Sequence, residues 1–399
     1  MAAPKLRFKE FDGAWSETLF QDLFIFKNGV NASKEQYGSG IKFINVLDII
    51  NNPNGITYDS IIGSVNISSK EIDKNLVKYG DVLFQRSSET REEVGQSNVY
   101  LGKDPVVFGG FVIRGSAQKE YDPIFMNGLL KTDSLRDQIT QLSGGSTRFN
   151  IGQDSLNKVS AYLPLKEEQT KIASFLSAVD EKISQLTQKH KLLSQYKQGM
   201  MQKLFSQQIR FKADDGSEFG EWEETNLISI SEIIMGSSPK SEHYNENSIG
   251  LPLLQGNADI KNRKSVPRLH TSEITKTCNI NDILLSVRAP VGFVATSEHI
   301  ACIGRGLCAI RAKNEYSQDF LYQWLLNHEK SWVSLSQGST FDSVNSEQIK
   351  KLCILIPCLE EQTKIANFLS AIDQKIDVVS EQLEQAKLWK KGLLQQMFV

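Results

Sequence analysis

Apolar positions in two long segments of the chain recur alternately every four and three residues. The segments cover 172–204 and 365–397. This spacing places the apolar residues along one side of a helix, and over about five heptads it predicts a coiled coil. Pro164 and Pro357 stand just before the two segments, where proline does not interrupt a helix. The predicted seam residues, which are also the candidates for partner docking, are Ile172, Leu176, Val179, Ile183, Leu186, Ile365, Leu369, Ile372, Ile376 and Val379.

Outside these segments, short apolar runs alternate with clusters of Gly, Asn, Ser and Asp, which is the pattern of strands joined by turns. The predicted strands include 82–84, 106–108, 283–285 and 354–356, and helices are predicted over 124–142 and 317–335. We therefore predict an α+β protein. Its chain divides into mixed domains and long helices over residues 1–163, 164–206, 207–356 and 357–399.

Comparison of the chain with itself reveals a duplication. Residues 167–183 recur as 360–376 with 14 of 17 positions identical, at an offset of 193 residues. The same offset relates Gly145-Ser-Thr147 to Gly338-Ser-Thr340. Two copies are too few for a repeat array, so we expect two similar domains, each followed by a long helix. If the helices, each about 60 Å long, pack antiparallel, the result is a dumbbell with pseudo-two-fold symmetry.

Composition argues against several classes of protein. With 45 basic and 47 acidic residues, the net charge of −2 is not that of a polycation that coats nucleic acid. No stretch approaches the roughly 18 uninterrupted apolar residues of a membrane helix, and the first residues lack a secretory signal, so we expect a cytoplasmic protein. The cysteines are odd in number and lack zinc-ligand spacing. We predict no metal site and buried thiols at Cys278, Cys302, Cys308, Cys353 and Cys358.

The sequence carries no motif for catalysis. It lacks the phosphate-binding G-x4-G-K-[ST] loop and the Asn/Asp-Pro-Pro-aromatic signature of adenine methylases. Asp122-Pro-Ile-Phe125 lacks the second proline, and we interpret it as a turn into a helix with proline at its start. Gly304–Ala309 fits G-x-G-x-x-A, but the residues after it predict a strand, not the helix of a dinucleotide site.

The chain resembles the specificity subunit of type I restriction–modification complexes. The resemblance rests on Leu163-Pro-Leu-Lys-Glu-Glu-Gln-Thr-Lys and its copy Ile356-Pro-Cys-Leu-Glu-Glu-Gln-Thr-Lys, on the two Gly-Ser-Thr elements, and on Trp15 and Trp222 near the start of each domain. It implies that residues 1–163 and 207–356 are target recognition domains and that the helices are spacers.

The resemblance also implies partners and a division of labour. Each recognition domain would read one half of a bipartite double-stranded DNA site. The chain would dock two adenine-methylating modification subunits, which restriction and translocase subunits join, and it would have no catalysis or cofactor of its own. S-adenosylmethionine, ATP and Mg are expected on partner subunits only. The location would be the cytoplasm of a prokaryote, at the nucleoid.

Candidate DNA contacts are basic and amide side chains beside glycines and small residues. Arginine reads guanine bidentately and asparagine reads adenine, while flanking glycines let the backbone approach phosphate. The candidates are Arg86, Thr147, Arg148, Asn150, Lys261, Arg263, Arg288, Arg305, Ser339 and Thr340. Each has an alternative interpretation, since surface arginines form solvated ion pairs and Ser or Thr cap turns.

Two other functions remain open at this point. A coiled-coil scaffold could hold two protein-binding domains without DNA recognition, and binding to random duplex that weakens with salt would argue against it. An autonomous methyltransferase or nucleotide-binding enzyme would have to bind S-adenosylmethionine by itself. The lack of catalytic motifs disfavours that second alternative.

Overall fold

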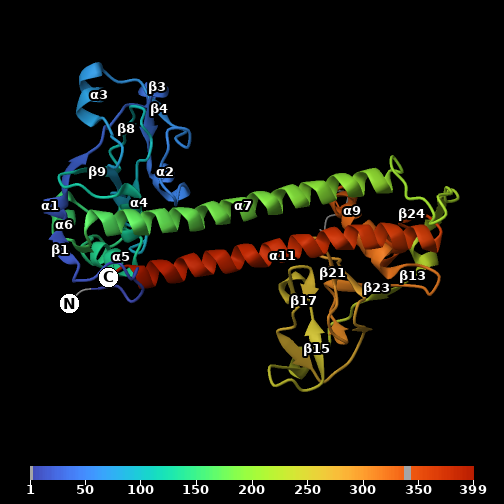
Figure 1. Ribbon diagram of the computed structural model, residues 1–399. Coiled ribbons are helices and arrows are strands. Elements are labelled where there is room, and N and C mark those ends of the chain that lie inside the picture. Colours follow the sequence, from blue (N-terminus) through green and yellow to red (C-terminus); the bar gives the residue numbers. More distant parts are fainter. Residues whose placement is uncertain (1–2, 337–342) are drawn as a thin grey trace. The chain divides into compact units, whose positions relative to one another are not determined.

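The computed structural model describes residues 3–336 and 343–399, and its mixed helices and sheets confirm the α+β prediction (Figure 1). The chain forms two compact units. Unit 1 holds residues 1–188 and 381–399, and unit 2 holds residues 189–380. Two long helices, α7 (Lys166–Phe205) and α11 (Leu359–Met397), contribute to both units. Each unit therefore contains one mixed domain and a part of each long helix.

Unit 1 is built on a four-stranded antiparallel sheet of order β2-β9-β5-β7 and a three-stranded sheet of order β4-β3-β8. In the second sheet β3 and β8 run parallel. The elements before α7 are β1 (Ser16–Leu19), α1 (Phe20–Leu23), β2 (Phe24–Asn28), η1 (Lys34–Gln36), β3 (Tyr37–Ile44), α2 (Val46–Asn51), β4 (Ser64–Val65), α3 (Ser69–Asn75), β5 (Val82–Gln85), β6 (Ser87–Ser88), β7 (Ser97–Val99), β8 (Val107–Phe108), β9 (Val112–Ala117), α4 (Pro123–Leu129), α5 (Asp133–Gln141), β10 (Phe149–Asn150), α6 (Gln153–Asn157) and β11 (Ser160–Leu163).

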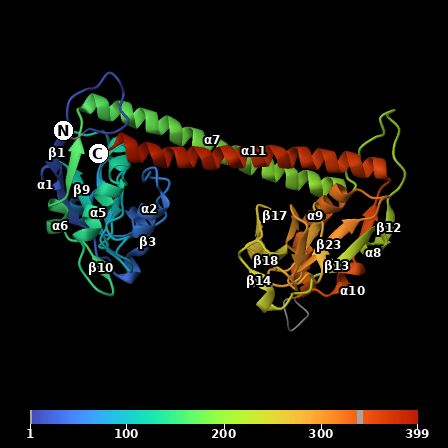
Figure 2. The same cartoon turned by 90° about the horizontal axis from the view of Figure 1, so that it is seen from below.

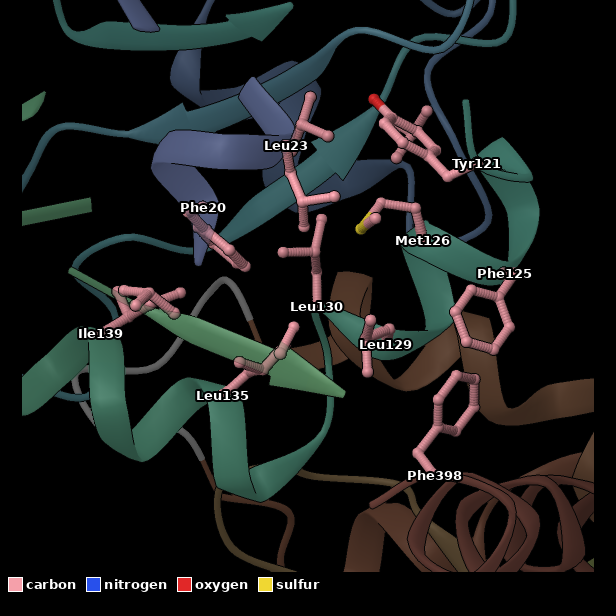
Figure 3. Packing of buried hydrophobic residues seen from close by; sticks show 14 of the residues in the cluster. Phe20, Leu23, Tyr121, Phe125, Met126, Leu129, Leu130, Leu135, Ile139 and Phe398 are labelled. Atoms are coloured by element: carbon pink, nitrogen blue, oxygen red, sulfur yellow. The ribbon is translucent and has the colours of Figure 1, made fainter. Parts of the chain in front are cut away.

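The core of unit 1 lies between its sheets, its short helices and the long helices. Figure 3 shows Phe20 and Leu23 of α1 facing Met126 and Leu130 at α4, with Phe398 opposite Phe125. Every residue of β5 is buried, which accounts for the unbroken apolar run Val82–Phe84. The strand predicted over 82–84 is thus confirmed.

Unit 2 repeats this plan with more strands. A six-stranded sheet has the order β13-β23-β20-β21-β17-β16, and a five-stranded sheet has the order β14-β18-β15-β22-β19. The elements between the long helices are β12 (Glu223–Asn226), α8 (Leu227–Ile230), β13 (Ser231–Met235), η2 (Ser241–His243), β14 (Tyr244–Asn245), β15 (Leu251–Leu254), η3 (Asn257–Asp259), β16 (Ile260–Lys261), β17 (Lys264–Ser265), β18 (Leu269–Thr271), β19 (Thr277–Cys278), β20 (Ile283–Ser286), β21 (Val294–Thr296), β22 (Ala301–Ile303), β23 (Leu307–Ala312), α9 (Gln318–Ser336), α10 (Ser346–Lys350) and β24 (Cys353–Ile356).

Helix α9 joins the six-stranded sheet to α11 in one core. Its Phe320 and Leu325 pack in the same cluster as Ile283 of β20 and Leu369 of α11. Figure 2 shows α9 between the β13–β23 strands and the long helices. The strands predicted over 283–285 and 354–356 and the helix predicted over 317–335 are confirmed by β20, β24 and α9.

Two predictions about local structure are wrong. The helix predicted over 124–142 is two helices, α4 and α5, because Thr132 adopts an extended backbone conformation as the N-cap of α5. The cysteines are also not uniformly buried. Cys278, Cys302 and Cys308 are buried, but Cys353 and Cys358 are exposed, since β24 alternates sides and Cys358 precedes the first turn of α11.

Two other motif interpretations are confirmed. Asp122 caps α4, its Oδ1 accepting hydrogen bonds of 2.9 and 3.1 Å from the backbone N–H of Ile124 and Phe125, with Pro123 in the first turn. The residues after Gly304 continue into the strand β23 rather than a helix, so the G-x-G-x-x-A match is not a dinucleotide site.

The long helices pack antiparallel within each unit. In unit 1 the apolar residues near the start of α7 share a core with the end of α11, through Leu393, Met397 and Phe398. In unit 2 the end of α7, through Met201 and Leu204, joins the start of α11. Eight of the ten predicted seam residues lie in these cores or pack against them, and the other two, Leu186 and Val379, are buried as well. The end of each long helix thus completes the core of the domain that precedes the other.

Continued along each helix, the four- and three-residue spacing of the seam reaches one lysine, Lys197 in α7 and Lys390 in α11, and both lysines are ion-paired. In unit 2, Lys197 Nζ lies 2.6 Å from Asp373 Oδ1. In unit 1, Lys390 pairs with Asp180. The two pairs are related by the 193-residue offset. A polar group at an otherwise apolar seam specifies helix register, so we assign that role to both pairs.

The duplicated Glu-Glu-Gln motif anchors each mixed domain to its long helix. The Glu168 carboxylate accepts two hydrogen bonds of 2.7 Å from the Arg7 guanidinium and one of 3.4 Å from Trp15 Nε1. Glu361 accepts the same set from Arg210, at 3.0 and 2.6 Å, and from Trp222 Nε1 at 3.1 Å. Both carboxylates are buried. The recurrence of the motif therefore has a structural cause.

The glutamine of this motif makes a second anchor. Gln169 Nε2 donates to the carbonyl oxygen of Pro164, and its Oε1 accepts from the backbone N–H of Asp122, both at 3.0 Å. Gln362 donates likewise to Pro357 and accepts from the backbone amide that precedes α9. Within residues 3–336 and 343–399, no helix is long and apolar enough to cross a membrane.

Candidate nucleic-acid interface

In unit 1 a glycine-rich turn joins β8 to β9, and polar side chains lie against it. The turn is held by hydrogen bonds from Gly109 N to the Ile44 carbonyl (3.0 Å) and from Val112 N to the Gly109 carbonyl (2.9 Å). A Cβ at Gly110 would lie 1.8 Å from Asn31 Oδ1, so only glycine allows this approach. Asn31 and Asn45 therefore lie directly against the turn, and both are exposed.

Arg86 completes this group from the neighbouring strand. Its backbone N–H donates to the Phe111 carbonyl at 2.8 Å, and its Nη1 reaches the Gly110 carbonyl at 3.4 Å. Arg86 is exposed, and among the described residues no carboxylate lies within ion-pair distance of it. The guanidinium is therefore available for an external acceptor.

The structure brings Arg86 together with three other predicted residues. Strand β6 pairs with β10, which places Asn150 opposite Ser87, and the Ser87 hydroxyl bonds Asn150 Oδ1. Arg148 and Thr147 lie on the exposed loop just before β10. A further cation, Arg91, lies 5.6 Å from the centre of the Phe149 ring. Three arginines thus lie in or beside this pair of strands, and none of them forms an ion pair with a carboxylate among the described residues.

Unit 2 holds a turn with the same hydrogen bonds. Gly304 N donates to the Leu254 carbonyl (2.8 Å), and Leu307 N donates to the Gly304 carbonyl (3.1 Å). Arg305 lies in this turn with its side chain exposed, and its backbone N–H bonds the Ser238 hydroxyl at 3.1 Å. The turn is therefore the counterpart of Gly109–Val112 in unit 1.

Around the unit 2 turn the structure forms a polar hollow of about 260 Å³. It brings together the two predicted arginines, Arg288 and Arg305, which lie seventeen positions apart in the sequence. The lining residues are Ser238, Gln255, Gly256, Asn257, Ser286, Arg288, Ala289, Arg305 and Gly306. Guanidinium and amide groups in one small hollow can present several donors to an acceptor-rich base edge or phosphate.

Sequence reasoning missed the amides of both turns. Asn31 and Asn45 in unit 1 and Gln255 and Asn257 in unit 2 come from loops remote in sequence from the arginines. Asn257 Oδ1 is buried without a hydrogen-bond partner among the described residues. The only available signal was that Asn45 and Gln255 each directly follow a strand.

Lys261 and Arg263 lie elsewhere, on the β16–β17 hairpin. Lys261 is exposed and stands opposite Lys264. The Arg263 guanidinium makes hydrogen bonds of 2.5 and 3.0 Å to the Glu329 carboxylate and lies 5.0 Å from the centre of the Phe293 ring. These contacts engage Arg263 within the protein, in contrast to Arg86. Ser339 and Thr340 lie outside the described residues.

The comparison with known families decides what these paired turns belong to. The model of the type I restriction modification DNA specificity domain matches residues 15–195 and again residues 220–388. The chain belongs to this specificity family. The match confirms the predicted tandem arrangement of two recognition domains and the predicted role of a specificity subunit, which is the non-catalytic subunit of its complexes.

Individual relatives agree with the family assignment. The chain is 30% identical over 404 residues to a Methanocaldococcus jannaschii protein assigned as the type I restriction enzyme MjaX specificity subunit, covering 98% of this chain and 94% of the relative. It is 23% identical over 363 residues to the type I restriction enzyme StySPI specificity subunit of Salmonella potsdam, covering 82% of this chain and 78% of the relative.

Solved structures show the same fold. An S subunit from a type I restriction–modification system of M. genitalium has a TM-score of 0.64 at 19% identity, with 100% of this chain and 99% of that one covered. A chain from a study of complex assembly in the type I R-M system also has a TM-score of 0.64, at 23% identity and 98% coverage of both. Membership of the specificity family implies DNA and the other restriction–modification subunits as partners.

Proposed function

We propose that each mixed domain of this specificity protein reads one half of a bipartite DNA site through its glycine turn. The observation that carries the proposal is that the same turn occurs in both domains with different polar side chains around it. Asn31, Asn45 and Arg86 surround the first turn, and Arg288 and Arg305 surround the second. Equal backbones with unequal side chains are what two different half-sites require.

The chemistry of these side chains suits direct reading of bases. An arginine donates two parallel hydrogen bonds to guanine O6 and N7, and an asparagine or glutamine pairs with adenine N6 and N7. The first turn is rich in asparagine, and the second has two arginines with Gln255. We therefore expect the second half-site to contain guanine and the first to contain adenine at the contacted positions.

We further propose that the chain assembles with two methyltransferase subunits on the outer faces of its long helices, and that restriction and translocase subunits join them. The seam faces of α7 and α11 are occupied within the protein, which leaves the outer faces for partners. S-adenosylmethionine, ATP and Mg would then be bound by those partners. The protein would act in the prokaryotic cytoplasm, at the nucleoid.

The experiment is co-expression of the full chain with its modification subunits, followed by mapping of methylated adenines across a genome. A bipartite motif with an unread spacer is the expected result. Arg305→Ala should then relax or weaken recognition of one half-site only, and Arg86→Ala that of the other. Equal losses at both half-sites would contradict independent domains. Binding to duplex DNA that does not weaken with salt would contradict phosphate contacts and favour a scaffold.

A further inference from the structure

Phe111 is an apolar side chain in the middle of the polar turn of unit 1. Its side chain is 64% exposed, although the turn around it carries Asn31, Asn45 and Arg86. Leaving a phenylalanine in water forgoes the free energy of burying it. Its position among hydrogen-bonding groups rather than among other apolar side chains calls for a specific explanation.

The backbone holds the Phe111 ring in this exposed place. The Phe111 carbonyl accepts the backbone N–H of Arg86 at 2.8 Å. On its N-terminal side, a Cβ at Gly109 would lie 2.9 Å from the Phe43 ring, and one at Gly110 would meet Asn31. The turn is packed against its neighbours over this length, so the base of the ring has a defined position before any ligand arrives. Such preorganisation lowers the entropic cost of binding.

Unit 2 has no apolar group at the equivalent point. The matching hydrogen bonds of the two turns place Gly306 where unit 1 has Phe111. A Cβ at Gly306 would lie 2.3 Å from the Gln255 carbonyl oxygen, so a side chain does not fit there. The turn of unit 2 instead borders the 260 Å³ hollow. The two domains thus present opposite shapes, an apolar projection and a polar recess.

We propose that Phe111 makes an apolar contact with a base of the half-site read by unit 1. This inference rests on the proposed function and adds one specificity-determining residue to it. Phenylalanine gains favourable contact with DNA at two apolar surfaces, the methyl group of thymine and the face of an unstacked base. The flanking Arg86 and asparagines supply the donors for the surrounding base edges and phosphates, which a purely apolar protein partner would leave unpaired.

The test measures binding of the full chain to duplexes that carry the mapped half-sites. Phe111→Ala should weaken binding about 10-fold, the loss being confined to the half-site read by unit 1. Phe111→Leu, which keeps an apolar side chain, should recover part of the affinity. Ile25→Ala is the matched control, because Ile25 is 60% exposed on β2 at the other end of the sheet and should change nothing.

Two arms identify the contacted surface. The first arm places 2-aminopurine at single positions other than the methylated adenine, with no modification subunits present. Its fluorescence should increase on binding if Phe111 stacks on an unstacked base. Deoxyuridine in place of thymine should weaken binding if the ring contacts a methyl group. Either effect should be absent in Phe111→Ala. If the wild type binds both half-sites and Phe111→Ala binds each of them as tightly as the wild type does, the inference is overturned. If the wild type binds duplexes with the mapped half-sites no more tightly than duplexes of random sequence, the proposed function fails instead.

Discussion

Replacing Arg7 with methionine should destabilise unit 1, because it leaves the Glu168 carboxylate buried without its cation. That carboxylate is 2% exposed and accepts both of its short hydrogen bonds from Arg7. Removing one partner of a buried ion pair costs about 3–5 kcal/mol. Arg7 itself is 17% exposed and Trp15 Nε1 still donates to Glu168, so we expect a loss of about 2–4 kcal/mol.

The double variant separates the cost of the stranded charge from the loss of packing. In Arg7→Met/Glu168→Met, apolar side chains replace the whole pair, and such replacements are often neutral. Only the long hydrogen bond from Trp15 is then lost, which costs on the order of 1 kcal/mol. The double variant should therefore be more stable than Arg7→Met alone.

The assay is urea unfolding combined with hydrogen exchange read by mass spectrometry. Arg7→Met should speed exchange in the segment around Glu168. Arg210→Met, which breaks the matching bonds to Glu361, should act in unit 2 and leave that segment unchanged. A double variant as unstable as Arg7→Met would mean that the stranded carboxylate of Glu168 is not the source of the lost stability.

Three further predictions concern the long helices and unit 1. Leu369→Glu, at a fully buried seam position, should abolish co-purification with modification subunits before it alters sequence preference. Lys197→Met should cost about 1–3 kcal/mol in calorimetry, less than a fully buried pair because Asp373 is 32% exposed, and Lys197→Arg should restore part of it. Burial lowers the pKa of Lys131 to about 7. Between a pH of about 7 and about 10, Lys131 therefore binds more protons in the unfolded state than in the folded state. The free energy of unfolding in urea should rise with pH over this range. Lys131→Met should remove that part of the slope.

The duplication made most of the architecture predictable. A heptad pattern identifies the long helices because the seam is buried along its length, and the repeated motif marks the start of each. The break between α4 and α5 was not predicted. A threonine such as Thr132 can hydrogen-bond to the backbone and so favour a helix end, but whether the helix ends there depends on the packing of the neighbouring core. Individual arginines were predictable as candidates from nearby glycines, but their free or engaged state was not.

The two equivalent halves, the mixed domain and long helix in each, and the resemblance to a family could all be recognised from the order of residues. These features depend on neighbouring residues or on residues at fixed spacings, so the sequence alone reveals them. The folded protein was needed to see that Glu329 holds Arg263, whereas Arg86 has no carboxylate partner among the described residues. It was also needed to see that Phe111 and Gly306 occupy the same place in two turns. Such facts depend on which distant segments meet, and long-range packing sets that.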